Sequence, residues 1–446
     1  MLIKSLLQYF DGQTKLLIKN SSWVLGGNLF RAVIMFVKSI VISRGLGVEL
    51  FGVFNLIAAF TVLIHQFLQF TLSSVLIKYG ADFLGEENQA KFQGLVKGIF
   101  STSLILGVIS NLIIVGATLL FYDVFFDRPD LHSYILLFGL VSSTIFIDGL
   151  SIGLLHLFYK FKQRSIIDII KVSLELLAVA LVLYLYPENF KYFFITLISV
   201  RLLGSVIFNT SAWIILAPQI GKFWKAKLSA IQAEKKAIIN FTLSNTGSRV
   251  LKNLSNNGDV LLLGALSGPS AVAFYNIAKK LAQTIQILVD PISNTLFPQL
   301  SHLISQRKFG EVQLMIRKIT KLLFLPCLLI MGVVYYFRAE VIQLAYGIEF
   351  LPATKPFIYL TANAVIGALV FWGLPMILSL GMVNFRFRVE AFLLCIGATV
   401  AYFTTPILGA SGVAIGLLIT NGGAQLFFSS VTYLKIRKVK KSEPID

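Results

Sequence analysis

Charged residues are scarce in this sequence. Asp, Glu, Lys and Arg make up 13% of its 446 residues, whereas 56% of the residues are hydrophobic. A soluble protein of this length cannot bury so much apolar side chain, so the composition excludes an ordinary soluble domain. Apolar runs of about 20 residues recur along the chain and are continuous rather than alternating, which indicates spanning helices. We therefore expect an all-α polytopic membrane protein.

Cysteine and histidine are also rare, which limits the chemistry available. The two cysteines, Cys327 and Cys395, fall inside predicted helices, so we expect neither a disulfide nor a metal site from them. His65 has no second His or Cys at ligand spacing, and the sequence contains no glycine-rich phosphate-binding loop. We expect no metal and no soluble cofactor.

Long polar segments are missing as well, because no connection between the apolar runs is large enough to form a domain. A membrane-embedded polymerase or glycosyltransferase usually needs a sizeable extramembrane loop with acidic or basic groups, so we expect that the protein is not an enzyme. The first 20 residues lack the shape of a cleavable signal. They are predicted to form a cytoplasmic or interfacial amphipathic lead-in.

The apolar runs predict twelve transmembrane helices. The seventh is the least certain, because the segment GSRVLKNLSNNGD (247–259) is very polar for a span. The predicted spans cover residues 21–43, 52–77, 95–121, 132–155, 165–186, 191–216, 237–266, 271–297, 318–337, 355–381, 389–406 and 409–433.

Basic residues concentrate in every second connection and in the tail, and the chain carries a net charge of +18. Because cytoplasmic loops are enriched in Lys and Arg, this pattern places both termini in the cytoplasm, which requires an even number of spans. The basic connections suit anionic lipid headgroups rather than nucleic acid. The connections concerned lie at 78–97, 160–164, 222–236, 307–321 and 386–388, with the tail at 435–441.

The chain also contains an internal repeat, because the seventh predicted span resembles the first moved by about 221 residues. The segment 46–58 likewise resembles 266–278, with a one-residue slip. Two six-helix lobes around a central cavity, with a site near the midplane, are the usual plan of an alternating-access transporter. The predicted parts are the lead-in 1–20, an N-lobe 21–216, a basic linker 217–236, a C-lobe 237–434 and a basic tail 435–446.

The first span carries a polar stripe. Arg31 and Lys38 are seven residues apart, close to two helical turns, and Asn28 lies three residues before Arg31, so all three share one face. Each cation costs about 2.5–3.5 kcal/mol at the membrane centre, so the stripe should face a wet cavity or a partner. Alternatively, Lys38 reaches to the nearer interface.

The fifth span carries both charges. Asp168 and Lys171 are spaced i,i+3, and Lys171 and Glu175 are spaced i,i+4, so we expect pairing within this helix, with an ion site at Glu175 as the alternative. Asp148 lies near a predicted cytoplasmic end, where it can be solvated. Arg201 has no partner in its own helix and is a candidate for a cavity.

Further ionisable residues lie near the repeat. Asp259 can pair with Arg249 or Lys252, and consecutive Lys279 and Lys280 point about 100° apart. His65 is expected to hydrogen-bond within the bundle. Should transport be driven by an ion gradient, the coupling candidates are Glu175, Asp259 and His65.

The excess of cations inside the predicted spans favours an anionic substrate, because Arg and Lys bind phosphate well. The asparagines and glutamines could bind sugar hydroxyls. The candidates for phosphate binding are Arg31, Lys38, Arg249, Lys252, Arg201 and Lys279. The candidates for sugar contacts are Asn28, Gln66, Gln69, Asn253 and Asn256.

Two sequence segments resemble a known family. Asn28-x-x-Arg31 followed by SRGLGVELFGVFNL (43–56), and GDVLLLGALSGPSAVAFYNIAKKL (258–281) followed by PISNTLFPQLSHL (291–303), are similar to the bacterial O-antigen type polysaccharide flippases. These flippases belong to the multidrug/oligosaccharidyl-lipid/polysaccharide exporter superfamily. The resemblance covers nearly the whole chain.

The resemblance implies translocation of undecaprenyl-pyrophosphate-linked oligosaccharides across the bacterial inner membrane. It also implies a polysaccharide polymerase and a chain-length regulator as possible partners, beside membrane lipids. The alternative is a cation-coupled multidrug exporter, whose branch commonly has an acid in the first span where this chain has cations. The branch that moves peptidoglycan precursors usually has two further helices.

Overall fold

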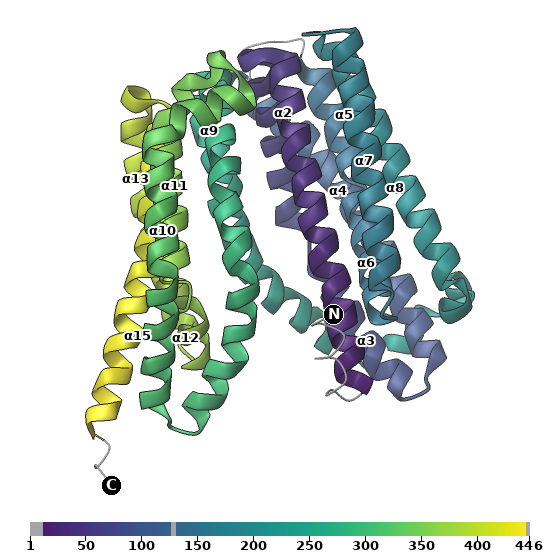
Figure 1. Ribbon diagram of the computed structural model, residues 1–446. Helices are drawn as coiled ribbons and strands as arrows, with labels where there is room; N and C mark the ends of the chain where they lie inside the picture. The colour runs from purple at the N-terminus through teal and green to yellow at the C-terminus, as the bar shows by residue number, and fades with distance from the viewer. Residues whose placement is uncertain (1–11, 126–130, 443–446) are drawn as a thin grey trace. The chain divides into compact units, whose positions relative to one another are not determined.

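The computed structural model describes residues 12–125 and 131–442, and nearly all of them are helical (Figure 1). No β-strand occurs in these two ranges, and the predicted all-α architecture is confirmed. Most of the predicted lead-in and the last four residues of the predicted tail lie outside the described residues. The N-terminal helices are α2 (Gly12–Leu68), α3 (Leu72–Gly85), α4 (Gln89–Phe125), α5 (His132–Ser142), α6 (Ile145–Leu157), α7 (Phe161–Leu185) and α8 (Phe190–Ile220).

The chain continues through two short 3₁₀ turns, η2 (Phe223–Lys225) and η3 (Leu228–Ile231), into the longest helix of the described chain. A π-helical turn, η5 (Leu418–Gly422), interrupts the last span. The remaining elements are α9 (Lys235–Ser305), α10 (Phe309–Tyr346), η4 (Ile348–Ala353), α11 (Thr354–Leu369), α12 (Gly373–Ser379), α13 (Val383–Leu408), α14 (Ala410–Leu417) and α15 (Gly423–Ser442).

Two glycines break α2 and α9 in the same way. Gly47 has φ 72° and ψ 178°, and Gly268 has φ 75° and ψ −178°. A positive φ is strained for residues with a Cβ atom, so glycine is the residue that allows each break. Gly268 follows Gly47 by the repeat distance found in the sequence.

The residues after each break also make matching hydrogen bonds. The Asn55 side chain donates to the Phe51 carbonyl at 2.7 Å, and the Asn276 side chain donates to the Val272 carbonyl at 3.0 Å. Both asparagines and both acceptors are related by the repeat distance. The internal repeat of the sequence is therefore a repeat of local backbone structure.

By length and composition, eight helices of the described chain can cross a membrane, or nine when the bent pair α11 and α12 counts as one span. One of the eight runs from Gly26 to Gly85 and another from Asn257 to Ile285, so each includes a glycine break and represents two arms. The charged helix α7 is not among the eight. Counting the bent pair as a span, dividing the two broken helices and adding α7 gives the twelve predicted spans.

The chain divides into two compact units. The N-terminal unit contains Met1–Leu46 and Ile57–Leu254, and the C-terminal unit contains Gly47–Leu56 and Ser255–Asp446. The first arm of α9 therefore begins in the N-terminal unit, and residues 47–56 belong to the C-terminal unit. The lobe boundaries expected from the sequence, 21–216 and 237–434, remain a prediction.

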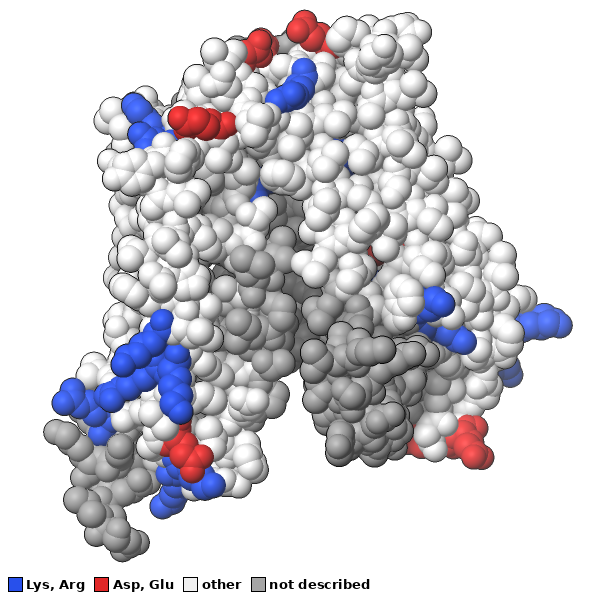
Figure 2. Space-filling view, viewed as in Figure 1, with Lys and Arg blue, Asp and Glu red and all other residues white. Residues whose placement is uncertain are grey.

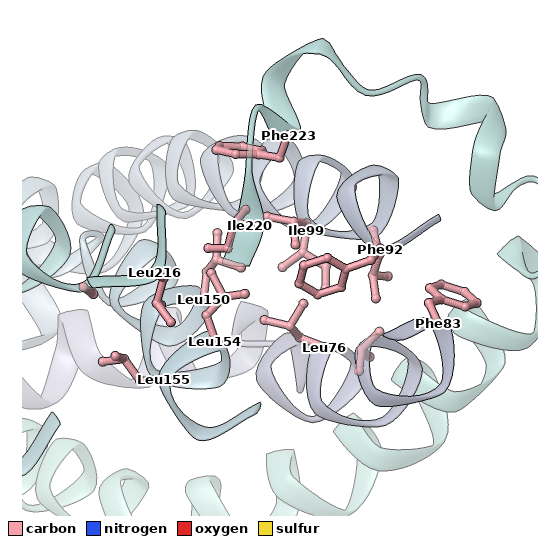
Figure 3. Close-up of a cluster of buried hydrophobic side chains, with 14 of the residues drawn as sticks. Leu76, Phe83, Phe92, Ile99, Leu150, Leu154, Leu155, Leu216, Ile220 and Phe223 are labelled. Atoms are coloured by element: carbon pink, nitrogen blue, oxygen red, sulfur yellow. The ribbon is translucent and has the colours of Figure 1, made fainter. Parts of the chain in front are cut away.

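The N-terminal unit has a hydrophobic core where α3, α4, α6 and α8 meet. Leu76, Phe92, Leu154 and Leu216 from these four helices are fully buried in one cluster, drawn in Figure 3. Phe223 from η2 caps this cluster. The core therefore holds the segment that follows α8 against this cluster of four helices.

The C-terminal unit contains a second core, formed by residues of α9, α10, α11 and α12 such as Leu300, Val312, Ala364 and Met376. Figure 2 shows basic side chains gathered at the end of this unit where α15 ends. The exposed basic residues at the connections and helix ends there are Arg307, Lys308, Arg317, Lys318, Lys321, Arg388, Lys435 and Arg437.

We predict that Gly47→Ala and Gly268→Ala each lower the free energy of unfolding by about 1–2 kcal/mol, because alanine is strained at this positive φ. Thermal unfolding of the purified protein measures this change. The control is Gly116→Ala in α4, where the added Cβ meets nothing within 4 Å and the backbone φ is not positive. Equal effects of all three changes would contradict the prediction.

Candidate functional site

The charges of α7 pair with three neighbouring helices. Asp168 lies 3.7 Å from Arg31 on α2, and Lys171 donates to Asp148 on α6 at 2.9 Å. Glu175 contacts Lys38 on α2 and an arginine on α8. The predicted pairing of Lys171 with Asp168 and Glu175 is therefore wrong, because the neighbouring helices present opposite charges beside each of these residues.

The pairs between α2 and α7 form two levels one heptad apart. Arg31 and Lys38 are seven residues apart on α2, and their partners Asp168 and Glu175 are seven residues apart on α7. Equal spacing in the same chain direction means that the two helices run parallel. The two cations of the stripe predicted on the first span thus face a partner helix.

Small residues let these two helices approach closely on either side of the charged levels. A Cβ atom on Gly27 would lie 2.9 Å from the Ser165 side chain, and one on Gly45 would lie 2.8 Å from the Leu183 side chain. The backbone N–H of Glu188 also donates to the Gly45 carbonyl at 2.9 Å. Close packing of this kind fixes the register of α2 against α7.

Glu175 is shared by two cations. Its Oε1 atom lies 3.0 Å from Lys38 Nζ and accepts a hydrogen bond from Arg201 Nε at 2.9 Å. Lys38 and Glu175 are each only 7% exposed, so Lys38 does not reach to an interface. The Arg201 guanidinium also lies over the Phe138 ring, 5.0 Å from its centroid. One negative charge balances two positive charges, which leaves the group with a net charge of +1.

The second charged level, seven residues earlier on α2 and α7, has the same ratio of two cations to one carboxylate. Asp168 lies 3.7 Å from Arg31 and 3.9 Å from Arg164, so again two cations share one carboxylate. Arg164 is also 2.9 Å from the Nε2 atom of His156. The Arg31 side chain is 41% exposed. The excess of positive charge expected from the sequence is therefore present in the N-terminal unit.

Asp148 belongs to a half-buried polar network. Its carboxylate accepts hydrogen bonds from Lys171 at 2.9 Å, from Ser205 at 2.6 Å and from Asn209 at 2.7 Å. Asn209 in turn accepts from Ser151 at 2.6 Å. The expectation that Asp148 is solvated is wrong, because Lys171, Ser205 and Asn209 occupy its carboxylate and its side chain is only 16% exposed.

The sequence interpretation named Arg201 of α8 but missed Ser205 and Asn209 on the same face. Arg201, Ser205 and Asn209 are spaced i, i+4 and i+8, so they form one stripe on this helix. That spacing is a readable signal of a face turned toward charged neighbours. Arg201 donates to the carboxylate of Glu175 on α7, and Ser205 and Asn209 both donate to the carboxylate of Asp148 on α6.

His65 is buried and hydrogen-bonded within the helical bundle, as expected from the sequence. Its Nε2 atom lies 3.2 Å from the Gly139 carbonyl oxygen, and its ring stacks on Phe146 with centroids 5.8 Å apart. No group of three His, Cys, Asp or Glu side chains that could hold a metal ion occurs among the described residues.

In the C-terminal unit, Asp259 joins the two arms of α9. It accepts a hydrogen bond from Tyr275 Oη at 2.5 Å and lies 2.6 Å from Lys279 Nζ, and both partners follow the Gly268 break. Lys280 points elsewhere, with its ammonium 5.5 Å from the centroid of the Phe51 ring. Lys279 therefore pairs with Asp259. From the sequence, Arg249 or Lys252 on the first arm of α9 was expected as the partner of Asp259.

The remaining predicted site residues lie on α2, just after it, or in α9. Asn28 is exposed on α2, Gln66 lies near the end of the same helix, and Gln69 lies in the break between α2 and α3. Four more residues lie in α9, but their side chains are outside the described part of the structure. They are Arg249, Lys252, Asn253 and Asn256.

Comparison with known families adds to this geometry. The model of a family described as "Polysaccharide biosynthesis protein" matches residues 17–304. The chain belongs to this polysaccharide biosynthesis protein family. The match includes all of the charged residues of α2, α6, α7 and α8 described above, so the family assignment covers the whole candidate site of the N-terminal unit.

Solved structures with a similar fold are transporters of the MOP superfamily. An inward-facing multidrug resistance MATE family transporter matches with a TM-score of 0.72 at 15% identity, covering 93% of this chain and 96% of that one. The lipid II flippase MurJ in an inward closed conformation matches with a TM-score of 0.67 at 14% identity, covering 94% and 92%. At these identities the likeness shows the fold alone.

Two more similar proteins differ in how much of this chain they match. A MOP superfamily transporter from Pyrococcus furiosus, described as having a binding pocket of reverse polarity, matches with a TM-score of 0.60 at 16% identity, covering 96% of this chain and 97% of that one. The inner membrane protein YghQ of Escherichia coli is 24% identical over 102 residues. That alignment covers 23% of this chain and 29% of YghQ.

We predict that Asp148→Leu destabilises the protein by about 1–3 kcal/mol, because it leaves the half-buried Lys171 ammonium without its carboxylate. Thermal unfolding in detergent measures the loss. Asp148→Leu combined with Lys171→Met should recover part of it, since the unpaired charge is then removed. The control, Asp82→Leu at an exposed position of α3, should change little. Equal melting temperatures for the Asp148 and Asp82 variants would refute a structural role for the network.

Proposed function

We propose that this polytopic transporter is a flippase for lipid-linked oligosaccharides. Its substrate would be an undecaprenyl-pyrophosphate-linked repeat unit, moved from the cytoplasmic to the outer leaflet of the bacterial inner membrane for O-antigen or capsule type polysaccharides. The family assignment supports a role in polysaccharide biosynthesis. The observation that carries the proposal is the pair of levels in the N-terminal unit where two cations share one carboxylate.

The cations suit a pyrophosphate headgroup. Arg31 and Arg201 each present a planar guanidinium, which can donate two parallel hydrogen bonds to a phosphate, and Lys38 adds a point charge between them. Partial exposure of Arg31 gives an approaching anion a first contact. We also propose phosphate contacts for Lys279, Arg249 and Lys252, and sugar contacts for Asn28, Gln66, Gln69, Asn253 and Asn256.

Glu175 gives the site a way to exchange anions. The carboxylate already occupies Lys38 and Arg201, so a phosphate that binds both cations has to displace it. When the phosphate leaves, Glu175 can return and neutralise the two cations. A proton taken up by the displaced carboxylate would offer a route for coupling to a proton gradient, with Asp259 and His65 as further candidates.

Orientation and surroundings follow from the charge distribution. Because basic residues mark cytoplasmic ends, we propose that the basic end of the C-terminal unit in Figure 2 and both chain termini lie in the cytoplasm. Transport would then proceed by alternating exposure of the site to the two membrane surfaces. A polymerase and a chain-length regulator in the same membrane are possible partners within this proposal.

A cation-coupled multidrug exporter is the second candidate, because a multidrug resistance transporter shares the fold with a TM-score of 0.72. Such an exporter would use Glu175 or Asp259 to bind a cation. The surplus of positive charge around Glu175 argues against this role, since an organic cation would be repelled by Lys38 and Arg201.

We predict that the purified protein carries a polyprenyl-pyrophosphate lipid in native mass spectrometry and that Arg31→Glu loses it by tenfold or more. The change places a second carboxylate beside Asp168 and repels the phosphate. Lys355→Glu, at an exposed position on α11, is the matched control and should keep the lipid. Absence of the lipid from the unchanged protein, or its full retention by folded Arg31→Glu, would count against the flippase.

We predict that Glu175→Gln binds inorganic pyrophosphate about tenfold more tightly than the unchanged protein while its rate of lipid flipping falls. Glutamine removes the negative charge that competes for Lys38 and Arg201, and a charged hydrogen bond contributes about 1.5–3 kcal/mol. Isothermal titration measures the affinity, and a leaflet-exposure assay in vesicles measures flipping.

Glu175→Asp, which keeps the charge, is the control for this comparison and should bind pyrophosphate like the unchanged protein. Weaker pyrophosphate binding by Glu175→Gln would show that the carboxylate helps rather than competes. Loss of organic-cation efflux in the same variant, without any effect on pyrophosphate, would favour the multidrug exporter.

A further inference from the structure

The segment that joins α8 to α9 is an ordered part of the N-terminal unit. Phe223 in η2 is buried and stacks on Trp213 of α8, with ring centroids 4.9 Å apart and an interplanar angle of 28°. Phe100 of α4 meets the same ring edge-on at 5.9 Å. Figure 3 shows Phe223 at the edge of the hydrophobic cluster. The segment is thus anchored by an aromatic side chain.

A stripe on α4 fastens the backbone of this segment. Gln89, Gln93 and Lys97 are spaced i, i+4 and i+8 along the helix. They donate to the carbonyls of Gln219 at 3.2 Å, Ile220 at 2.9 Å and Ala226 at 2.8 Å. The contacts join one face of α4 to the end of α8 and the start of the connection. The backbone of the connection is therefore held along α4.

A fourth contact holds the far end of the connection. Lys91 of α4 donates to the Glu234 carboxylate at 2.7 Å, and this hydrogen bond holds the pKa of Glu234 below its usual value. Glu234 is the first acidic residue after α8. Its charge is balanced by Lys91, so the connection before it presents only positive charge.

The outer side of the segment combines apolar and basic side chains. Trp224 is 58% exposed and Leu228 is 48% exposed, although their neighbour Phe223 is buried. Three exposed lysines lie among them. We call this set the linker platform; it consists of Lys222, Trp224, Lys225, Lys227 and Leu228.

We propose that the linker platform binds the headgroups of anionic phospholipids. The connection follows the last turn of α8, a helix apolar enough to span the membrane, so it lies at the level of a headgroup layer. Tryptophan favours this layer because its ring is apolar and its N–H is polar. Each lysine near an anionic surface strengthens binding by about fivefold. This inference concerns membrane lipids and stands apart from the proposed transport function.

The test is tryptophan quenching in vesicles that contain the full-length protein. Brominated phosphatidylglycerol or brominated phosphatidylcholine is included at the same low mole fraction in unbrominated phosphatidylcholine. The Trp224 contribution is the difference between the unchanged protein and Trp224→Phe. We expect several-fold stronger quenching of this contribution by the anionic lipid, because the lysines enrich it locally.

Replacing Lys222, Lys225 and Lys227 together by Gln should reduce the preference for the anionic lipid at least fivefold. Lys191→Gln at the other end of α8 is the matched control and should retain it. Equal quenching by both lipids would overturn the choice of anionic headgroups. No quenching by either lipid would show that Trp224 faces water or a protein partner, which would overturn the membrane assignment.

The hydrogen bonds from α4 to the connection give a second test. Lys97→Met keeps all three platform lysines but removes the hydrogen bond to the Ala226 carbonyl. We expect the preference for the anionic lipid to fall in this variant, because the lysines are no longer held beside Trp224. An unchanged preference would show that net charge alone is sufficient, and the proposal of a fixed platform would then be wrong.

Discussion

The N-terminal unit depends on the need to balance charges that its helices bury. A charge removed from water is costly unless an opposite charge and hydrogen bonds compensate it. Glu175 meets this need for Lys38 and Arg201 at once, and so ties α7 to α2 and α8. Lys171 of α7 adds a tie to α6. Helix α7 is therefore the organising element of the unit, because ion pairs fix its position against three neighbours.

The two halves of the chain share backbone structure, but their buried charges are balanced by different partners. Gly47 and Gly268 have nearly equal dihedral angles, and Asn55 and Asn276 make the same local hydrogen bond. At the repeated position of Lys38, however, the second half has Asp259. Asp259 finds its partners across the break in its own helix rather than on other helices. The repeat preserves the helix break and leaves the charges free to diverge.

Much of the fold could be predicted from the sequence, because apolar runs of membrane length specify helices directly. The repeat also located the region of both breaks, although it did not identify Gly47 and Gly268 as their cause. The pairing of α7 could not be predicted. Helical spacing shows that Lys171 and Glu175 share a face, but it does not show which helix lies opposite that face. Competition between local and interhelical partners is decided by packing, and here Asp148 and Lys38 lie closer.

We propose that Lys38 and Arg201 hold an anion in exchange for Glu175. The most direct measurement is a cryo-electron microscopy structure of the protein with a bound polyprenyl-pyrophosphate lipid. The account predicts phosphate density within hydrogen-bonding distance of the Arg201 guanidinium and the Lys38 ammonium, with Glu175 moved away from both. A lipid phosphate bound elsewhere, with the 3.0 Å contact between Lys38 and Glu175 intact, would contradict it.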